Sequence, residues 1–93
     1  MNTTPPNADA RFRPRLCQRL RLQWEPIQEA YVLLYPEGTV RLNASAGEIL
    51  SRCDGTHDLD EIIGELEKLF GTSGLATEVY RFIDHGRQRG WLD

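Results

Sequence analysis

The sequence predicts a single α+β domain in which a three-stranded antiparallel sheet is followed by three helices. Apolar residues alternate with polar ones around Leu22 and again at residues 39–43, on either side of a continuous apolar run at 30–35, and they recur at every third or fourth position after Asn43. Short connections rich in turn-forming residues join the strand-like segments, which favours an antiparallel meander with the middle strand in the centre. A chain of 93 residues is long enough for one such domain and too short for two.

Three segments carry the strand pattern. Leu20, Leu22 and Trp24 alternate with polar residues, as in a strand with one buried face, and Pro26 ends this segment. Residues 30–35 are β-branched, aromatic and apolar on both faces, which suits a central strand. Residues 39–43 alternate again and predict a third strand, so both outer strands are expected to have a free edge.

Three helical segments follow. Ser45 with Glu48 fits a capping box and predicts the start of a short helix, and Asp58 with Glu61 repeats this signature. The helical apolar stripes contain Ile49, Leu50 and Cys53, then Leu59, Ile62, Ile63, Leu66, Leu69 and Phe70, and finally Leu75, Val79, Phe82, Ile83 and Gly86. With the strands beside them, the last two helices are expected to form a winged helix-turn-helix-like domain.

The two ends of the chain differ in character. Residues 1–15 are polar, contain three prolines and offer no periodic apolar face. We interpret them as a flexible N-terminal arm and residues 16–93 as the folded domain. Gly90 closes the third helix, and Trp91 and Leu92 are expected to fold back as an apolar plug.

Catalysis would need a convergent set of reactive groups that the sequence does not display. His57 and His85 stand outside any metal-ligand spacing, and we expect both to be exposed to solvent. No nucleophile elbow, phosphate-binding loop or dinucleotide fingerprint occurs. We therefore expect a protein that is not an enzyme and has no catalytic residue, metal site or cofactor.

The cysteines and the hydropathy of the sequence indicate the cellular compartment of the protein. Cys17 and Cys53 lie too far apart for a C-x-x-C pair and are interpreted as free, reduced thiols. No apolar run approaches the roughly 20 residues of a membrane span, and the N-terminus lacks the apolar segment of a secretory signal. These features predict a cytoplasmic protein without a membrane partner.

Two functions without catalysis stay open, nucleic-acid binding and self-association. A winged helix commonly contacts DNA, and the arginines of the N-terminal arm can meet phosphates, but a net charge of −3 and a pI of about 5.3 argue against a nucleic-acid partner. The other alternative is a plain interaction module that forms a homodimer, for which Trp24, Tyr31 and Tyr35 supply apolar area.

The predicted third strand suggests how a peptide could bind. An outer strand has unpaired N–H and C=O groups that can template an added strand. The third helix should run beside it, so alternate side chains of an extended peptide could enter the space between strand and helix. Arg41 and Arg87 could hold acidic peptide residues at the rim.

Several runs of the sequence resemble the PqqD family. They are LQWEP at 22–26, EAYVLLYPEG at 29–38, VRLN at 40–43, Ala46 with Ile49 and Leu50, CDG at 53–55 and the closing GWL at 90–92. The resemblance covers about residues 12–93, which include the whole predicted domain.

The resemblance implies a function as well as a fold. Members of this family are winged-helix-like recognition elements for ribosomally made, modified peptides. They bind the precursor peptide PqqA and present it to the radical S-adenosylmethionine enzyme PqqE in pyrroloquinoline quinone biosynthesis, by strand addition to the third strand beside the third helix. Carried onto this chain, the resemblance implies backbone pairing at Thr39, Val40, Arg41, Leu42 and Asn43, and a groove wall of Val79, Phe82, Ile83 and Arg87.

Overall fold

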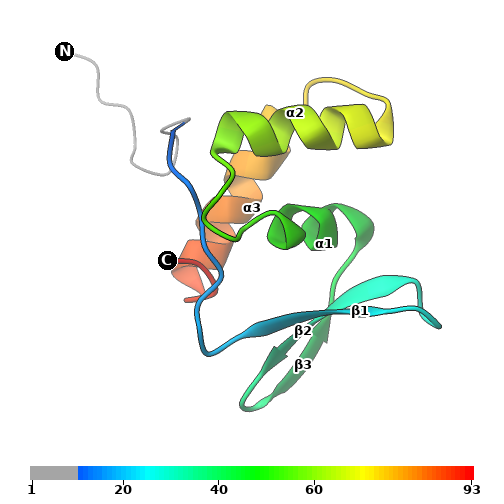
Figure 1. Ribbon diagram of the computed structural model, residues 1–93, viewed down its shortest axis with the longest axis vertical. Coiled ribbons are helices and arrows are strands. Elements are labelled where there is room, and N and C mark those ends of the chain that lie inside the picture. Colours follow the sequence, from blue (N-terminus) through cyan, green and yellow to red (C-terminus); the bar gives the residue numbers. More distant parts are fainter. Residues whose placement is uncertain (1–10) are drawn as a thin grey trace.

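The computed structural model of the chain describes residues 11–93, which adopt the predicted α+β architecture. The strands are β1 (Arg21–Glu25), β2 (Ala30–Tyr35) and β3 (Gly38–Arg41), and they form an antiparallel sheet in the order β1-β2-β3. The helices are α1 (Ala44–Ser51), α2 (Leu59–Phe70) and α3 (Ala76–Gln88). In Figure 1, α1 lies between the sheet and α2, and it packs on both β2 and α2.

β2 is the central strand, as its two apolar faces predict. Leu33 of β2 lies opposite Leu22 of β1 and Val40 of β3, and it is fully buried. The pairing of β3 with β2 continues one residue past the strand, because the N–H of Leu42 donates to the carbonyl of Tyr31 at 3.0 Å. Within residues 11–93, the other edge of β3 has no neighbouring strand and is open.

The start of α1 differs from the prediction. The N-cap is Asn43 and not Ser45, because the Asn43 side-chain oxygen accepts a hydrogen bond from the backbone N–H of Ala46 at 2.8 Å. Leu42 is the last residue bonded to β2, so Asn43 is the first residue free to adopt the cap conformation. The third strand therefore ends at Arg41, two residues earlier than expected.

α2 begins at the predicted Asp58 cap, whereas α3 begins without a side-chain cap. Asp58 and Glu61 form the reciprocal capping box, with both hydrogen bonds at 2.8 Å, and Gly71 ends α2 in the left-handed conformation. α3 follows Leu75, which provides no side-chain cap. The Leu75 N–H instead donates to the carboxylate of Glu67 on α2, at 3.0 Å.

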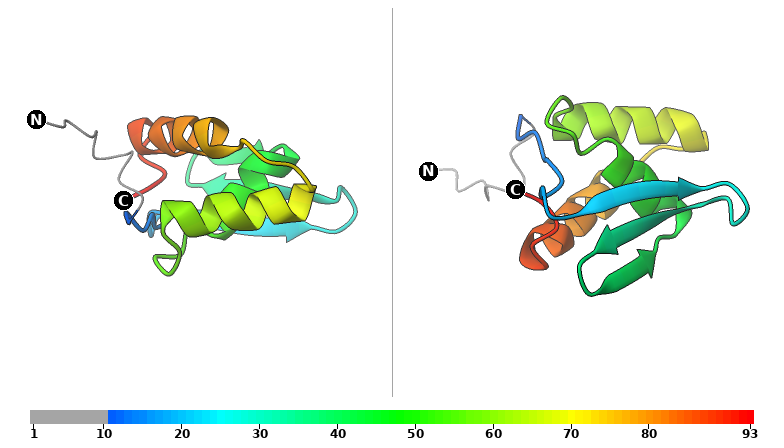
Figure 2. Two further views of the ribbon diagram at one scale, coloured as in Figure 1. Left: turned by 90° about the horizontal axis from the view of Figure 1, so that it is seen from above. Right: turned by 60° about the horizontal axis from the view of Figure 1, so that its bottom comes forward.

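One core lies between the sheet and the helices. Figure 2 shows from above how α2 and α3 lie side by side over α1 and the sheet. The buried apolar residues are Leu33, Leu42, Ala46, Ile49, Leu50, Cys53, Leu59, Ile62, Leu66, Val79, Ile83 and Leu92.

Both ends of the described chain pack on this core. Leu92 is 6% exposed and forms an isolated bridge with Leu16, which confirms the predicted apolar plug. Phe12 packs against the core and Pro14 is fully buried. The described part of the predicted arm thus contacts the domain from Phe12 onward, and residues 1–10 lie outside the described residues.

Candidate functional site

The open edge of β3 carries two residues whose backbone groups point outward. In an antiparallel ladder, the N–H and C=O of alternate residues face the same neighbour. Because Leu42 donates to Tyr31, Leu42 and Val40 face β2, and Thr39 and Arg41 direct their backbone groups to the open edge. The side chains of Thr39 and Arg41 are exposed on the outer face, whereas Val40 and Leu42 pack toward the core.

The surface between this edge and α3 is hollowed in two places. The central hollow, about 400 Å³, is lined by Asn43, Ser45, Ala46, Ile49, Glu78, Arg81, Phe82 and His85. The hairpin hollow, about 350 Å³, is lined by Arg19, Leu20, Tyr35, Pro36, Glu37, Val40, Arg89, Gly90 and Trp91. The right-hand view of Figure 2 shows α3 beside the β2–β3 hairpin at this face.

An aromatic ledge, made of Phe82, His85 and Trp91, joins the two hollows. The Trp91 ring centroid lies 6.3 Å from that of Phe82 and 5.7 Å from that of His85. Arg89 adds to the ledge, because its Nε donates to His85 Nε2 at 3.0 Å and its guanidinium lies 5.7 Å from the Trp91 ring. We call the two hollows and the ledge together the β3–α3 groove.

The residues expected in the added-strand site lie at or beside this groove. Thr39 and Arg41 supply the outward backbone groups, and Val40 and Asn43 line the hairpin and central hollows. Leu42 is only 7% exposed and belongs to the core behind the strand.

The residues expected on the helix wall are divided among three environments. Phe82 lines the central hollow, but Val79 and Ile83 are 1% and 0% exposed and form part of the core. The Arg87 guanidinium lies 4.5 Å from the ring centroid of Phe12. An α-helix turns about 100° per residue, so Arg87 lies roughly 140° around the axis from Phe82, away from the groove.

On α3 and at its C-cap, sequence reasoning did not identify Glu78, Arg81, His85 and Arg89 as groove residues. Glu78, His85 and Arg89 lie four residues before, three after and seven after Phe82, a spacing that places them on one helix face. That spacing was the signal that could have found them.

The groove is more basic than the protein as a whole. Arg19, Arg81 and Arg89 line its hollows together with Glu37 and Glu78, while the whole chain has a net charge of −3. Such a local excess of positive charge attracts acidic segments and orients their approach.

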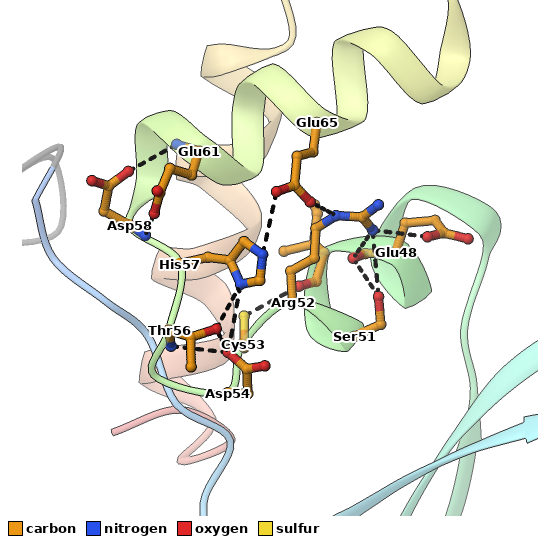
Figure 3. Close-up of polar contacts among 11 residues, drawn as sticks. Glu48, Ser51, Arg52, Cys53, Asp54, Thr56, His57, Asp58, Glu61 and Glu65 are labelled. Atoms are coloured by element: carbon orange, nitrogen blue, oxygen red, sulfur yellow. Dashed lines mark hydrogen bonds and ion pairs between the residues drawn. The ribbon is translucent and has the colours of Figure 1, made fainter.

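A polar network away from the groove holds α1 against α2 (Figure 3). Arg52, which caps the end of α1, donates to Glu48 at 2.9 Å and to Glu65 of α2 at 2.7 Å. The same Glu65 lies 3.3 Å from His57 Nε2. The His57 side chain is 27% exposed and hydrogen-bonded, so it is more enclosed than the sequence predicted. This network supports the scaffold on which the groove is built.

The two free cysteines differ in their surroundings. Burial raises the pKa of Cys53 to about 12, and its thiol donates to the carbonyl of Ile49 at 3.2 Å. Cys17 is half-buried, and hydrogen bonds with Arg19 lower the pKa of its thiol. Across residues 11–93, no three His, Cys, Asp or Glu side chains gather into a group that could hold a metal ion. Nor does this part of the chain contain a helix long and apolar enough to span a membrane.

Known proteins resemble the chain in both sequence and fold. The model of a family described as coenzyme PQQ synthesis protein D (PqqD) matches residues 30–92, which include β3 and α3. A PqqA binding protein of Methylococcus capsulatus is 42% identical over 73 residues, 78% of each chain. Another from Azotobacter vinelandii is 42% identical over 81 residues, 86% of this chain and 88% of that protein.

A solved structure has the same fold. It is the solution NMR structure of the PqqD truncation of Methylobacterium extorquens PqqCD, described as a functional, stand-alone recognition element for ribosomally synthesized and post-translationally modified peptides. The two structures superpose with a TM-score of 0.65 at 25% sequence identity, over 86% of this chain and 87% of that one.

Proposed function

The chain belongs to the PqqD family, and from that premise we propose that it binds the precursor peptide PqqA and presents it to the radical S-adenosylmethionine enzyme PqqE. The relatives from Methylococcus capsulatus and Azotobacter vinelandii are named for binding PqqA, and the similar solved structure is described as a peptide recognition element. The observation that carries the proposal is the open edge of β3 beside the β3–α3 groove.

The peptide is proposed to add to β3 as a fourth strand. Its backbone would pair with the outward N–H and C=O groups of Thr39 and Arg41. Every second side chain would then face the aromatic ledge, where Phe82 and Trp91 offer apolar contact. Acidic side chains at the rim would meet the arginines of the groove.

Backbone pairing alone is too weak to hold the peptide. Two outward-facing residues offer at most four hydrogen bonds, each contributing about 1 kcal/mol net. Association costs about 4–15 kcal/mol in lost freedom. Apolar contacts in the groove must supply the difference, so the depth and continuity of the hollows matter as much as the strand edge.

Binding of this kind requires no chemistry from the chain itself. A bound peptide becomes a tethered substrate, and its effective concentration at the active site of a partner enzyme rises. The role proposed here is therefore that of an adaptor between PqqA and PqqE.

Fluorescence anisotropy with labelled synthetic PqqA, followed by gel filtration with added PqqE, tests this function. We expect a complex of chain and peptide, and a larger complex that retains all three components. A DNA duplex with the same label is the control for the nucleic-acid alternative. Absence of peptide binding near millimolar concentration, with and without PqqE, would overturn the proposal, and a peptide complex that excludes PqqE would overturn its presentation step.

A further inference from the structure

We propose that the peptide continues past the end of β3 and places one apolar side chain in a third hollow, at the tips of the helices. This helix-tip hollow, about 370 Å³, lies between the end of α2 and the starts of α1 and α3. The inference rests on the proposed function, because its occupant is a further part of the same peptide.

The lining of the helix-tip hollow is mostly apolar, and the hydrophobic core holds part of it in place. Ile49, Leu66 and Val79 line it, and each is only 1% exposed, so their positions are set by the core. Phe70 and Leu75 line it as well, and Phe70 is 41% exposed despite its size. A volume in the range of about 300–1,000 Å³ with mostly apolar walls is typical of pockets that take small ligands or side chains.

The hollow is continuous with the β3–α3 groove. It shares Asn43, Ser45, Ile49 and Glu78 with the central hollow. Asn43 follows the last residue of β3 by two positions, so a peptide paired with that strand is led directly to this opening. Antiparallel pairing is the more stable arrangement, and it places the anchoring residue on the N-terminal side of the paired segment of the peptide.

The exposed apolar surface here suits one side chain better than a second copy of the protein. The large exposed side chains at this end of α2 are Leu69, 53% exposed, and Phe70. Side chains of this size, half covered, leave on the order of 200 Å² open, whereas a stable dimer buries about 800 Å² on each partner. An apolar anchor on a peptide already held by β3 needs far less area.

Adjacent residues of α2 provide the test and its control. Phe70→Ala removes a wall of the hollow, whereas Leu69→Ala removes an exposed side chain that does not line it. Anisotropy titrations with labelled PqqA should show about tenfold weaker binding for Phe70→Ala and no change for Leu69→Ala. Ala44→Lys, which places a charge at the mouth of the hollow from α1, should give a similar loss and guards against a folding defect in the first variant.

A set of PqqA peptides, each with one apolar residue replaced by alanine, identifies the anchor. One of these alanine peptides, changed on the N-terminal side of the paired segment, should bind the unmodified protein more weakly than PqqA does. The Phe70→Ala variant should bind that peptide no more weakly than the unmodified protein does, because the anchor that contacts Phe70 is already absent. Equal affinities of the folded Phe70→Ala, Ala44→Lys and Leu69→Ala variants would overturn the inference and leave peptide binding intact. A molecular mass of the protein that rises with its concentration, and no longer rises in the Phe70→Ala variant, would also overturn the inference, because a second copy of the protein would then occupy the hollow. Failure of the unmodified protein to bind PqqA would overturn the proposed function along with the inference.

Discussion

Replacing Thr39 with proline probes the open edge of β3 at a single backbone atom. The N–H of Thr39 points away from β2, so proline removes an outward donor without removing a hydrogen bond of the β2–β3 ladder. The neighbouring Val40 would be a poorer choice, because its N–H faces β2 and its loss would weaken the sheet itself. The Thr39 side chain is exposed, so little packing is lost.

The expected magnitude follows from the loss of one hydrogen bond. Its net contribution is about 1 kcal/mol, and a peptide carbonyl left unpaired beside α3 raises the cost to about 1–3 kcal/mol. Binding of PqqA should therefore weaken by roughly 5–150-fold.

Anisotropy titration at 25 °C measures this loss, with Thr39→Ala as the matched control. The control changes the same side chain but keeps the N–H, so it should bind PqqA almost as tightly as the unmodified protein. Thermal melts followed by circular dichroism establish that both variants are folded. If folded Thr39→Pro binds within twofold of Thr39→Ala, the peptide does not pair with this edge.

Two further predictions concern the scaffold. Gly47→Ala should cost about 1–3 kcal/mol of stability, because its Cβ would lie 2.7 Å from Tyr31 Cδ2, whereas Gly64→Ala meets nothing within 4 Å and should add about 1 kcal/mol. Hydrogen bonds from Thr56 lower the pKa of Asp54 from 3.8 to about 2. The Asp54 carboxylate therefore stabilises the fold above about pH 4, and this contribution is lost as the pH falls toward 2. In the Asp54→Asn variant, stability should therefore fall less steeply as the pH is lowered.

Denaturant midpoints measure both effects. Equal midpoints for Gly47→Ala and Gly64→Ala would contradict the close packing of α1 on β2. For the acid decline, Glu37→Gln in the exposed β2–β3 turn is the control. An Asp54→Asn variant whose decline matches that of this control would contradict the hydrogen-bonded role of Asp54.

Periodicity was sufficient to predict the elements and their order. The apolar run of β2 indicated a central strand, and the Asp58–Glu61 pair located the start of α2 within one residue. The start of α1 was not predictable in the same way, because Asn43 and Ser45 are both good caps. The choice between them depends on where the β3 ladder ends, which is a tertiary property.

The rotation of α3 could not be predicted either. Val79, Phe82 and Ile83 read as one apolar stripe in the sequence, but the fold divides the stripe between core and groove. The division depends on the C-terminal plug, since Leu92 packs against Gly86 on the core side of α3 and Trp91 contacts Phe82 on the groove side. The sequence predicted that Trp91 and Leu92 fold back, but it did not indicate which residues of α3 each of them contacts.

Strand addition to β3 is tested most directly by amide hydrogen exchange of the labelled protein with and without PqqA. The amides of Thr39 and Arg41 face the open edge, so they are predicted to become protected when the peptide saturates the site. The amides of Val40 and Leu42 face β2 in the free protein, and their protection should change little. Saturation with PqqA while Thr39 and Arg41 exchange as fast as in the free protein would contradict strand addition.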